Sequence, residues 1–190
     1  MKENKIMEYK YKTPLDMRDM AIIDAFPTYD VREKTILNIG CGEGRIDFHL
    51  ADMGYRVYAT DIKRYETWIN GSNPSFHISD IFDLSSIPVS SASIVVCSQA
   101  LKHLSGYKMA MVNLFALTAI RLIITVPYRY SFDSPDHCNY WSDSESGMFK
   151  DINEFAELCK PYSTSISKIR TKPEDKIHNK YDYLITVDKG

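Results

Sequence analysis

Three glycines at alternate positions follow a short apolar run near the start of the chain. Residues 35–45 read TILNIGCGEGR, so the run ends in Gly40, Gly42 and Gly44. A glycine-rich turn between a strand and a helix lets a ligand approach the backbone amides closely. The spacing is G-x-G-x-G, because position 45 is arginine, and it differs from the dinucleotide fingerprint G-x-G-x-x-G. Two interpretations remain open at this stage, a turn without a ligand and a cofactor-binding loop.

Two acidic residues follow the next two predicted strands. Asp61 ends the strand YRVYATDI, and a carboxylate at this position can accept hydrogen bonds from both hydroxyls of a ribose. Asp80 ends the strand SFHISDI and is followed by Ile81 and Phe82. A carboxylate beside apolar side chains suits an adenine ring with its exocyclic amine. Each acid alone is typical of a strand-end cap, but both after a glycine loop favour a nucleoside-containing cofactor.

Strand and helix patterns alternate along most of the chain. The predicted strands cover residues 34–40, 55–62, 75–81, 93–99, 121–128, 163–171 and 181–190. The predicted helices cover residues 13–26, 45–54, 64–70, 106–120 and 151–160, the first capped by Thr13 and the last by a box of Asp151 and Glu154. This order predicts an α/β fold with a Rossmann-like, mostly parallel sheet and helices on both faces.

These motifs together resemble those of the class I S-adenosylmethionine-dependent methyltransferases, in particular the small type 11 group. The resemblance is carried by ILNIGCGEGR, YATDI, HISDIFDLSSIPVSSASIVVCSQALKHL and RLIITVPY, which span residues 35–128. It implies a seven-stranded sheet whose last strand is antiparallel, and S-adenosyl-L-methionine as the cofactor. The implied cofactor-binding residues are Gly40, Cys41, Gly42 and Gly44 around the methionine part, Asp61 on the ribose, Ile62, Asp80 and Ile81 around the adenine, and Ser98 and Gln99 beneath the sulfonium.

One position departs from the pattern of that family. The family often has LEHL after the fourth strand, where this chain has Leu101-Lys102-His103-Leu104. A base therefore replaces an acid at the rim of the implied site. The change leaves the cofactor residues intact, but it weakens any inference about the acceptor from the family alone.

Methyl transfer to a hydroxyl is helped by a general base, and histidine is the usual candidate because it titrates near neutral pH. The chain has five histidines. His49 and His77 fall in a predicted helix and strand, and His178 falls in a polar loop, so structural or solvated roles are expected for them. His103 follows the fourth strand, and both a structural role in packing and a catalytic role remain open for it.

The segment 127–150 is a long stretch between the fifth strand and the next predicted helix. It is rich in aromatic residues and holds the group DHCNYW, with His137 three residues before Tyr140. Long irregular loops in compact domains are usually functional or disordered, and aromatic density argues against disorder. A hydrophobic cluster over the sheet edge is one interpretation, and a pocket for the methyl acceptor is the other. We take His137 as the best single candidate for a base, with His103 and Tyr140 as further catalytic candidates.

Composition and missing motifs narrow the function classes. A net charge of −2 and a charged fraction of 25% do not call for a nucleic-acid or membrane partner. No apolar run approaches the roughly 18 residues of a membrane span. The four cysteines form no C-x-x-C pair, so no zinc site is expected, and no acidic cluster indicates another metal. The segment after the fourth strand lacks the Asp-Pro-Pro-Tyr and Pro-Cys arrangements of enzymes that methylate nucleic-acid bases.

The sequence thus predicts a single domain over residues 1–190, with an N-terminal arm and helix at 1–34 and an acceptor-side loop at 127–150. The expected function is methyl transfer to a small metabolite or sugar, in a reduced, cytoplasmic protein. RNA or protein methylation remains an alternative, because lysines and arginines gather near the C-terminus at Lys168, Arg170, Lys172, Lys176 and Lys180. A non-catalytic cofactor-binding module is the third alternative, because a protein can keep its fold and cofactor loop after it loses catalytic activity. The oligomeric state stays open.

Overall fold

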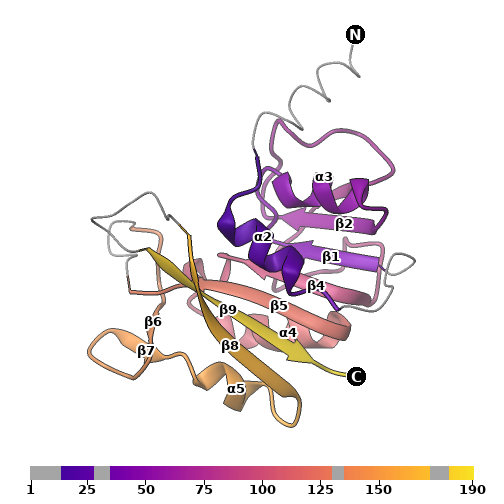
Figure 1. Cartoon of the computed structure of the whole chain (residues 1–190). Coiled ribbons are helices and arrows are strands. Elements are labelled where there is room, and N and C mark those ends of the chain that lie inside the picture. Colours follow the sequence, from indigo (N-terminus) through magenta and orange to yellow (C-terminus); the bar gives the residue numbers. More distant parts are fainter. Residues whose placement is uncertain (1–13, 28–34, 130–134, 172–179) are drawn as a thin grey trace.

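The protein is built on one seven-stranded sheet with the strand order β3-β2-β1-β4-β5-β9-β8. The computed structural model describes residues 14–27, 35–129, 135–171 and 180–190 (Figure 1). All neighbouring strands from β3 to β5 are parallel, and β9 runs antiparallel to both β5 and β8. The strands are β1 (Thr35–Ile39), β2 (Arg56–Asp61), β3 (Ser75–Ile78), β4 (Ala92–Ser98), β5 (Thr118–Pro127), β8 (Ser163–Arg170) and β9 (Tyr181–Asp188). The predicted Rossmann-like sheet with an antiparallel last strand is confirmed.

Helices cover both faces of this sheet. On one face α2 (Met17–Asp24) and α3 (Arg45–Asp52) pack against alternate side chains of the central strands, including Ile36, Val57 and Ile94. On the other face α4 (Tyr107–Leu117) and α5 (Glu154–Leu158) share a core with Leu37, Val95 and the residues that alternate with the first set. Figure 1 shows α2 and α3 together on one side of the strands, with α4 behind them. Burial on both faces explains why the central strands are continuously apolar.

The strand order reverses between β1 and β4. From β1 the chain moves outward to β2 and β3, and it then returns to add β4 and β5 on the other side. The loops after β1 and β4 therefore separate at the carboxyl edge of the sheet, which is where open α/β folds bind their ligands. The 3₁₀ turn η1 (Leu101–His103) follows β4 at this edge. The fold thus places the glycine loop and the segment after β4 at the same crevice.

The first helix begins later than predicted. Its N-cap is Asp16, whose side chain accepts from the amides of Arg18 and Asp19, while the Asp19 carboxylate accepts from the amide of Asp16. This reciprocal capping box fixes the helix start at Met17 because it satisfies the first amides of the helix. The expected cap at Thr13 lies outside the described residues.

Residues 64–70, predicted as a helix, form turns instead. The reason is tertiary, because the side chain of Trp68 is buried and its indole nitrogen donates to the carbonyl of Gly42 at 2.8 Å. Arg64 is likewise engaged, with its guanidinium donating to the carbonyl of Trp68 at 3.2 Å. These contacts outweigh the weak local preference of a short segment for a helix.

The segment before the last helix also differs from the prediction. Asp151 lies in β7 (Phe149–Asp151), which pairs with β6 (Tyr140–Ser142), and α5 is capped by Asn153 without a side-chain bond. The expected box of Asp151 and Glu154 is therefore wrong. Glu154 instead accepts hydrogen bonds from Tyr107 at 2.6 Å and from Trp141 at 2.9 Å, which ties three elements together. In the middle of the chain, β5 begins at Thr118, so α4 ends three residues before its predicted end.

Candidate active site

The glycine loop is held in place by backbone hydrogen bonds to the neighbouring strand. The amides of Gly40 and Cys41 both donate to the carbonyl of Thr60 on β2, and the amide of Gly44 donates to Cys41. All three glycines have positive φ, at 78°, 55° and 79° for Gly40, Gly42 and Gly44. This left-handed conformation strains other residues, so the backbone path alone favours glycine at each position.

The three glycines differ in what surrounds them. A Cβ atom on Gly40 would lie 2.7 Å from the Cβ of Ala100, and one on Gly44 would lie 2.6 Å from the ring of Phe76. A Cβ on Gly42 would meet no atom within 4 Å. Close packing within the chain therefore requires glycine at 40 and 44. Only at Gly42 does the missing side chain leave open space.

Asp61 contacts the centre of the glycine loop. Its Oδ2 atom accepts a hydrogen bond of 2.9 Å from the amide of Gly42, while Oδ1 has no hydrogen-bond partner among the described residues. The side chain is half-buried, and the next residue, Ile62, is 70% exposed. The carboxylate of Asp61 thus lies beside the loop, and its second oxygen remains available for a ligand.

An aromatic cluster of Trp68, Phe76 and Phe48, which was not predicted from the sequence, packs beside the glycine loop. Trp68 and Phe76 stack with ring centroids 5.1 Å apart, and Phe48 contacts Phe76 at 5.4 Å. Trp68 binds the carbonyl of Gly42, and Thr67 donates to the carbonyl of Glu43 at 2.6 Å. The only sequence signal was the unusual run of aromatic residues around 65–76, because the contacts join elements far apart in the chain.

Asp80 and Ile81 lie beyond the end of β3 with different surroundings. Asp80 is exposed, and its carboxylate accepts from the amide of Phe82 at 2.9 Å. Ile81 is buried in the core beside α4, and its carbonyl accepts from Asn113. The exposed apolar side chains near this edge include Ile62, Ile78 at the end of β3, and Phe82, which are 70%, 55% and 44% exposed. Packing thus assigns Ile81 a core role, whereas Asp80 remains accessible.

Ser98 and Gln99 close the carboxyl end of β4. The hydroxyl of Ser98 lies 2.8 Å from that of Thr125, and the amide nitrogen of Gln99 lies 3.3 Å from the same hydroxyl. Gln99 has a φ of 61°, which is uncommon for a residue with a side chain. Strained backbone of this kind gathers at functional sites. Both side chains are bound to β5 through the Thr125 hydroxyl, which fixes their positions at the end of β4.

The structure brings the three catalytic candidates together. The rings of His103 and His137 are 4.8 Å apart in an edge-on arrangement, and those of His137 and Tyr140 are 6.4 Å apart. The Tyr140 hydroxyl donates to the carbonyl of His137 at 3.2 Å. The segment is bound to η1, since the amides of Cys138 and Asn139 both donate to the carbonyl of Lys102. Two loops separated by over thirty residues thus form one cluster.

His103 has its tautomer fixed by this arrangement. Its Nδ1 atom lies 3.2 Å from the carbonyl oxygen of Asp136, and a carbonyl can only accept, so Nδ1 carries the proton. Nε2 is then an acceptor in the neutral ring. Burial lowers the pKa of His103, and the nearby Lys102 and His137 lower it further, against an opposing contribution from Asp136. A neutral imidazole with a free Nε2 is what proton removal needs.

The remaining aromatic residues of the loop divide between the two predicted interpretations. Trp141 is fully buried and packs edge-on against Tyr107, within the core under α4 and α5. Tyr140 and Phe149 are only partly buried, with rings 6.5 Å apart. Part of the segment is therefore a hydrophobic cluster, and part faces outward beside the histidines. Tyr130 and Phe132 lie outside the described residues.

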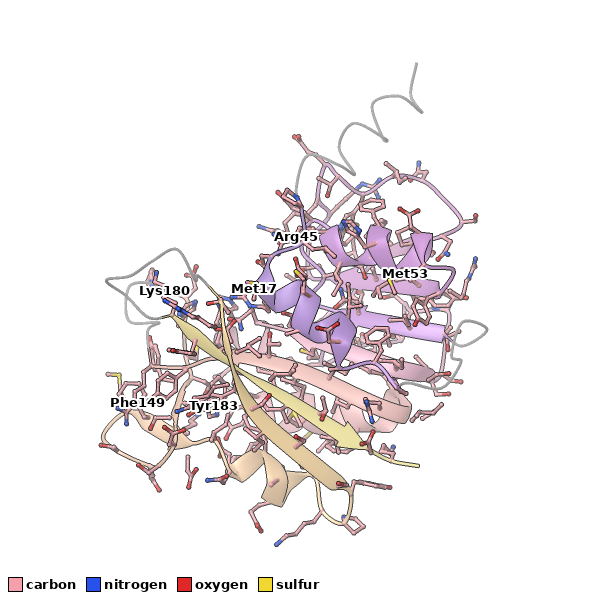
Figure 2. All side chains as sticks on the ribbon, viewed as in Figure 1. Met17, Arg45, Met53, Phe149, Lys180 and Tyr183 are labelled. Carbon is pink, nitrogen blue, oxygen red and sulfur yellow. The ribbon has the colours of Figure 1, made fainter. Side chains whose placement is uncertain are left out.

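The N-terminal end of α2 covers the same edge of the sheet. Arg45, the first residue of α3, bridges Asp16 and Asp19 at 2.8 and 2.7 Å. Arg18 donates to the fully buried Asp182 of β9 at 2.5 Å. Figure 2 shows Arg45 beside the end of α2 that carries Met17. Ion pairs thus connect α2 to the helix after the glycine loop and to the far half of the sheet.

A buried carboxylate lies behind the glycine loop. Asp47 in α3 is fully buried, and the Asn38 amide nitrogen donates to its carboxylate and lies 3.0 Å from each of the two oxygens. Burial raises the pKa of Asp47 to about 7, and the Asn38 hydrogen bonds only partly oppose that effect. The Asn38 amide oxygen is buried without a partner. The pair joins β1 to α3 immediately before and after the loop.

A comparison with known protein families finds one match. The family model described as "Methyltransferase domain" matches residues 37–118, the segment from the glycine loop through α4. This segment of the chain is therefore similar to methyltransferase domains. No curated protein matches the chain in sequence.

Solved structures of the same fold are numerous but distant in sequence. The magnesium protoporphyrin IX methyltransferase of Synechocystis PCC 6803 with bound S-adenosylhomocysteine superposes with a TM-score of 0.66 at 15% identity, covering 98% of this chain and 94% of that one. The 1,6-didemethyltoxoflavin-N1-methyltransferase of Burkholderia thailandensis superposes with a TM-score of 0.63 at 17% sequence identity, covering 84% of this chain and 72% of that one. The cyclase SpnF superposes with a TM-score of 0.66 at 11% sequence identity, covering 90% of this chain and 80% of that one. At these identities the likeness shows the fold alone and does not identify an acceptor.

Three further features bear on metals, membranes and partners. Among residues in the described ranges, no group of three or more histidine, cysteine or acidic side chains could hold a metal ion. None of the described helices is long and apolar enough to cross a membrane. Lys168, one of the C-terminal basic residues, is paired with Asp143 at 2.6 Å, so the described part of that cluster is partly neutralised. Lys172 and Lys176 lie outside the described residues.

Proposed function

We propose that this protein is a methyltransferase that binds S-adenosyl-L-methionine in the crevice between the loops after β1 and β4 and methylates a small molecule. The observation that carries the proposal is the Asp61–Gly42 hydrogen bond at the strand-order reversal. It places a carboxylate with one uncommitted oxygen against the only glycine of the loop that borders open space. This arrangement matches what a ribose and an aminocarboxylate need.

The residues present fit that cofactor. Asp61 would receive the ribose hydroxyls, and the exposed Asp80 would receive the adenine amine. The loop 40–44 would offer backbone groups to the methionine part, with Gly42 at the point of closest approach. When bound, the cofactor supplies an electrophilic methyl group on a sulfonium. The protein then needs to orient the acceptor, exclude water and, where the acceptor is a hydroxyl, remove a proton.

The acceptor side is formed by the histidine cluster. His103, which follows β4, lies beside His137 of the acceptor-side loop. The Tyr140 hydroxyl donates to the carbonyl of His137. His103 would take the proton through Nε2, because Nδ1 is held by Asp136. The outward-facing Tyr140 and Phe149 would contact an acceptor of small or aromatic character. The structural neighbours that methylate a porphyrin and a toxoflavin precursor are consistent with a small-molecule acceptor.

Titration calorimetry tests the proposal directly. S-adenosylmethionine and S-adenosylhomocysteine should bind at one site with micromolar dissociation constants, each displacing the other, and NAD should not compete. Micromolar binding of NAD without competition from S-adenosylhomocysteine would overturn the assignment. Tight cofactor binding without methyl transfer to any acceptor would favour a non-catalytic module, because one fold can carry different functions. A salt-dependent shift of RNA would favour RNA methylation.

A further inference from the structure

Lys102 lies immediately after the segment that touches the glycine loop. Ala100 packs against Gly40, and Lys102 follows two residues later in η1. The Nζ atom of Lys102 donates to the Gln99 side-chain oxygen at 3.2 Å. Because Gln99 ends β4 at the strand-order reversal, the amine is held at the crevice in which the methyl group would be transferred.

The charge of Lys102 is not balanced by an ion pair within the described part of the chain. No carboxylate among the described residues lies within ion-pair distance of Lys102, whose side chain is half-buried. The nearest acid that influences it is Asp182, but that carboxylate already accepts a hydrogen bond of 2.5 Å from Arg18. Burial lowers the pKa of Lys102, and the like charge of Arg18 lowers it further, while Asp182 acts in the opposite direction.

Among the described residues, Lys102 thus has a neutral hydrogen-bond acceptor, Gln99, but no carboxylate in ion-pair contact. A partly desolvated positive charge without a counter-ion is unfavourable, and an anion that enters the site relieves that cost. Neighbouring charges do not fill this role, because Asp16 and Asp19 are both bound by Arg45. The imbalance lies beside His103, on the side of the crevice that the acceptor would occupy.

We propose that Lys102 binds an anionic group, a carboxylate or a phosphate, on the methyl acceptor. This rests on the proposed function and narrows its acceptor class to anionic small molecules. Lys102 acts as a specificity residue, with Gln99 fixing its direction. The strained backbone of Gln99 supports this reading, because its side chain bridges the hydroxyl of Thr125 and the amine of Lys102.

The experiment compares three probes of similar shape, namely benzoate, phenyl phosphate and benzamide. Each is titrated into the full-length protein saturated with S-adenosylhomocysteine, using wild type, Lys102→Gln, Lys102→Arg and Lys160→Gln. Lys160 is the control, because it is 67% exposed and paired with Glu157 beyond the end of α5. Affinity for S-adenosylhomocysteine is measured for all four proteins, which shows that each variant is folded at the cofactor site.

Wild type should bind one of the anions roughly 10- to 100-fold more tightly than benzamide, the range expected for one charge-assisted hydrogen bond. Lys102→Gln should lose the preference, whereas Lys102→Arg and Lys160→Gln should keep it. A preference for benzoate over phenyl phosphate identifies a carboxylate acceptor, and the reverse identifies a phosphate.

Three results would overturn the inference. They are equal binding of the anions and benzamide, absence of binding by any of the probes, and an anion preference that survives in Lys102→Gln. A preference lost in both Lys102 variants would instead indicate a neutral amine that acts as a base, which also contradicts the inference. If S-adenosylhomocysteine itself does not bind wild type, the proposed function fails, and this outcome is distinct from cofactor binding without anion preference.

Discussion

The carboxylate of Asp61 and the amide of Gly42 are joined by a hydrogen bond of 2.9 Å, which fixes the end of β2 against the middle of the glycine loop. The same loop residue accepts a hydrogen bond from Trp68 through its carbonyl. Both contacts bear on the only glycine of the three that borders open space. The position and direction of this peptide are thus set from two sides, and the site can be tested at each contact.

Asp61→Ala should weaken binding of S-adenosylhomocysteine by about 1.5–3 kcal/mol, since a charged acceptor for buried hydroxyls is lost. Asp24→Ala, at the exposed end of α2, is the matched control and should bind normally. Calorimetry on both variants gives the comparison. An unchanged dissociation constant in Asp61→Ala would remove this residue from the site.

Gly42→Ala and Gly44→Ala should separate ligand contact from packing. Gly44→Ala forces a Cβ within 2.6 Å of the Phe76 ring at a φ of 79°, so we expect a large fall in melting temperature. Gly42→Ala adds a methyl group to open space and should cost only the backbone strain, about 1 kcal/mol. Its cofactor affinity should nevertheless fall at least tenfold. Normal affinity in Gly42→Ala would mean that no ligand approaches the loop there.

Trp68→Phe should remove one hydrogen bond to the glycine loop while it keeps the packing of the aromatic cluster. The substitution keeps a ring against Phe76 and removes the indole donor that binds Gly42. We expect cofactor affinity to fall by about 0.5–1.5 kcal/mol, the usual net value of such a hydrogen bond. Tyr65→Phe is a suitable comparison, because it changes a neighbouring ring that makes no hydrogen bond to the described loop. Equal effects in both variants would argue that packing alone matters.

His103→Ala should lower turnover by about 10²–10⁴-fold if proton removal occurs in the transition state. Cofactor affinity should hardly change, because ribose and adenine are bound at the opposite side of the crevice. In wild type the rate should fall as pH drops through the lowered pKa of His103, since only the neutral ring accepts a proton. His137→Ala is the paired variant, and a larger loss there would assign the base to His137. A large fall in melting temperature in either variant would indicate a structural role instead.

Asp47→Asn should change how stability depends on pH. The pKa of Asp47 is raised to about 7 in the folded protein, against 3.8 as the ordinary value, so the folded state binds more protons between about pH 4 and 7. Stability linked to this group is therefore present at low pH and is lost as pH rises through that window. Relative to Asp47→Asn, the free energy of unfolding of the wild type should fall by roughly 2–4 kcal/mol between pH 4 and pH 8. Urea unfolding at both pH values measures the difference, and identical profiles would contradict a buried ionisable Asp47.

The sequence determined the order of the elements and the positions of the cofactor loop, because those signals are local. Buried parallel strands are continuously apolar, glycines occupy the turn, and acidic residues follow the strand ends. Each of these patterns can be recognised within about ten residues of sequence. The same reasoning located the two histidines, although it could not show that they touch. Helix boundaries were less well determined, as the turns around Trp68 and the missing capping box at Asp151 show.

Only the tertiary structure decided what each site residue contacts. Gly40 and Gly44 are required by Ala100 and Phe76, Ser98 and Gln99 are bound to Thr125, and Ile81 is drawn into the core. The pairing of His103 with His137, and the lack of a carboxylate partner for Lys102 in the described ranges, were equally invisible in the sequence. The physical reason is common to all of them. Such contacts join segments brought together at the carboxyl edge of the sheet, and a one-dimensional pattern records which groups exist but not which groups remain for a ligand.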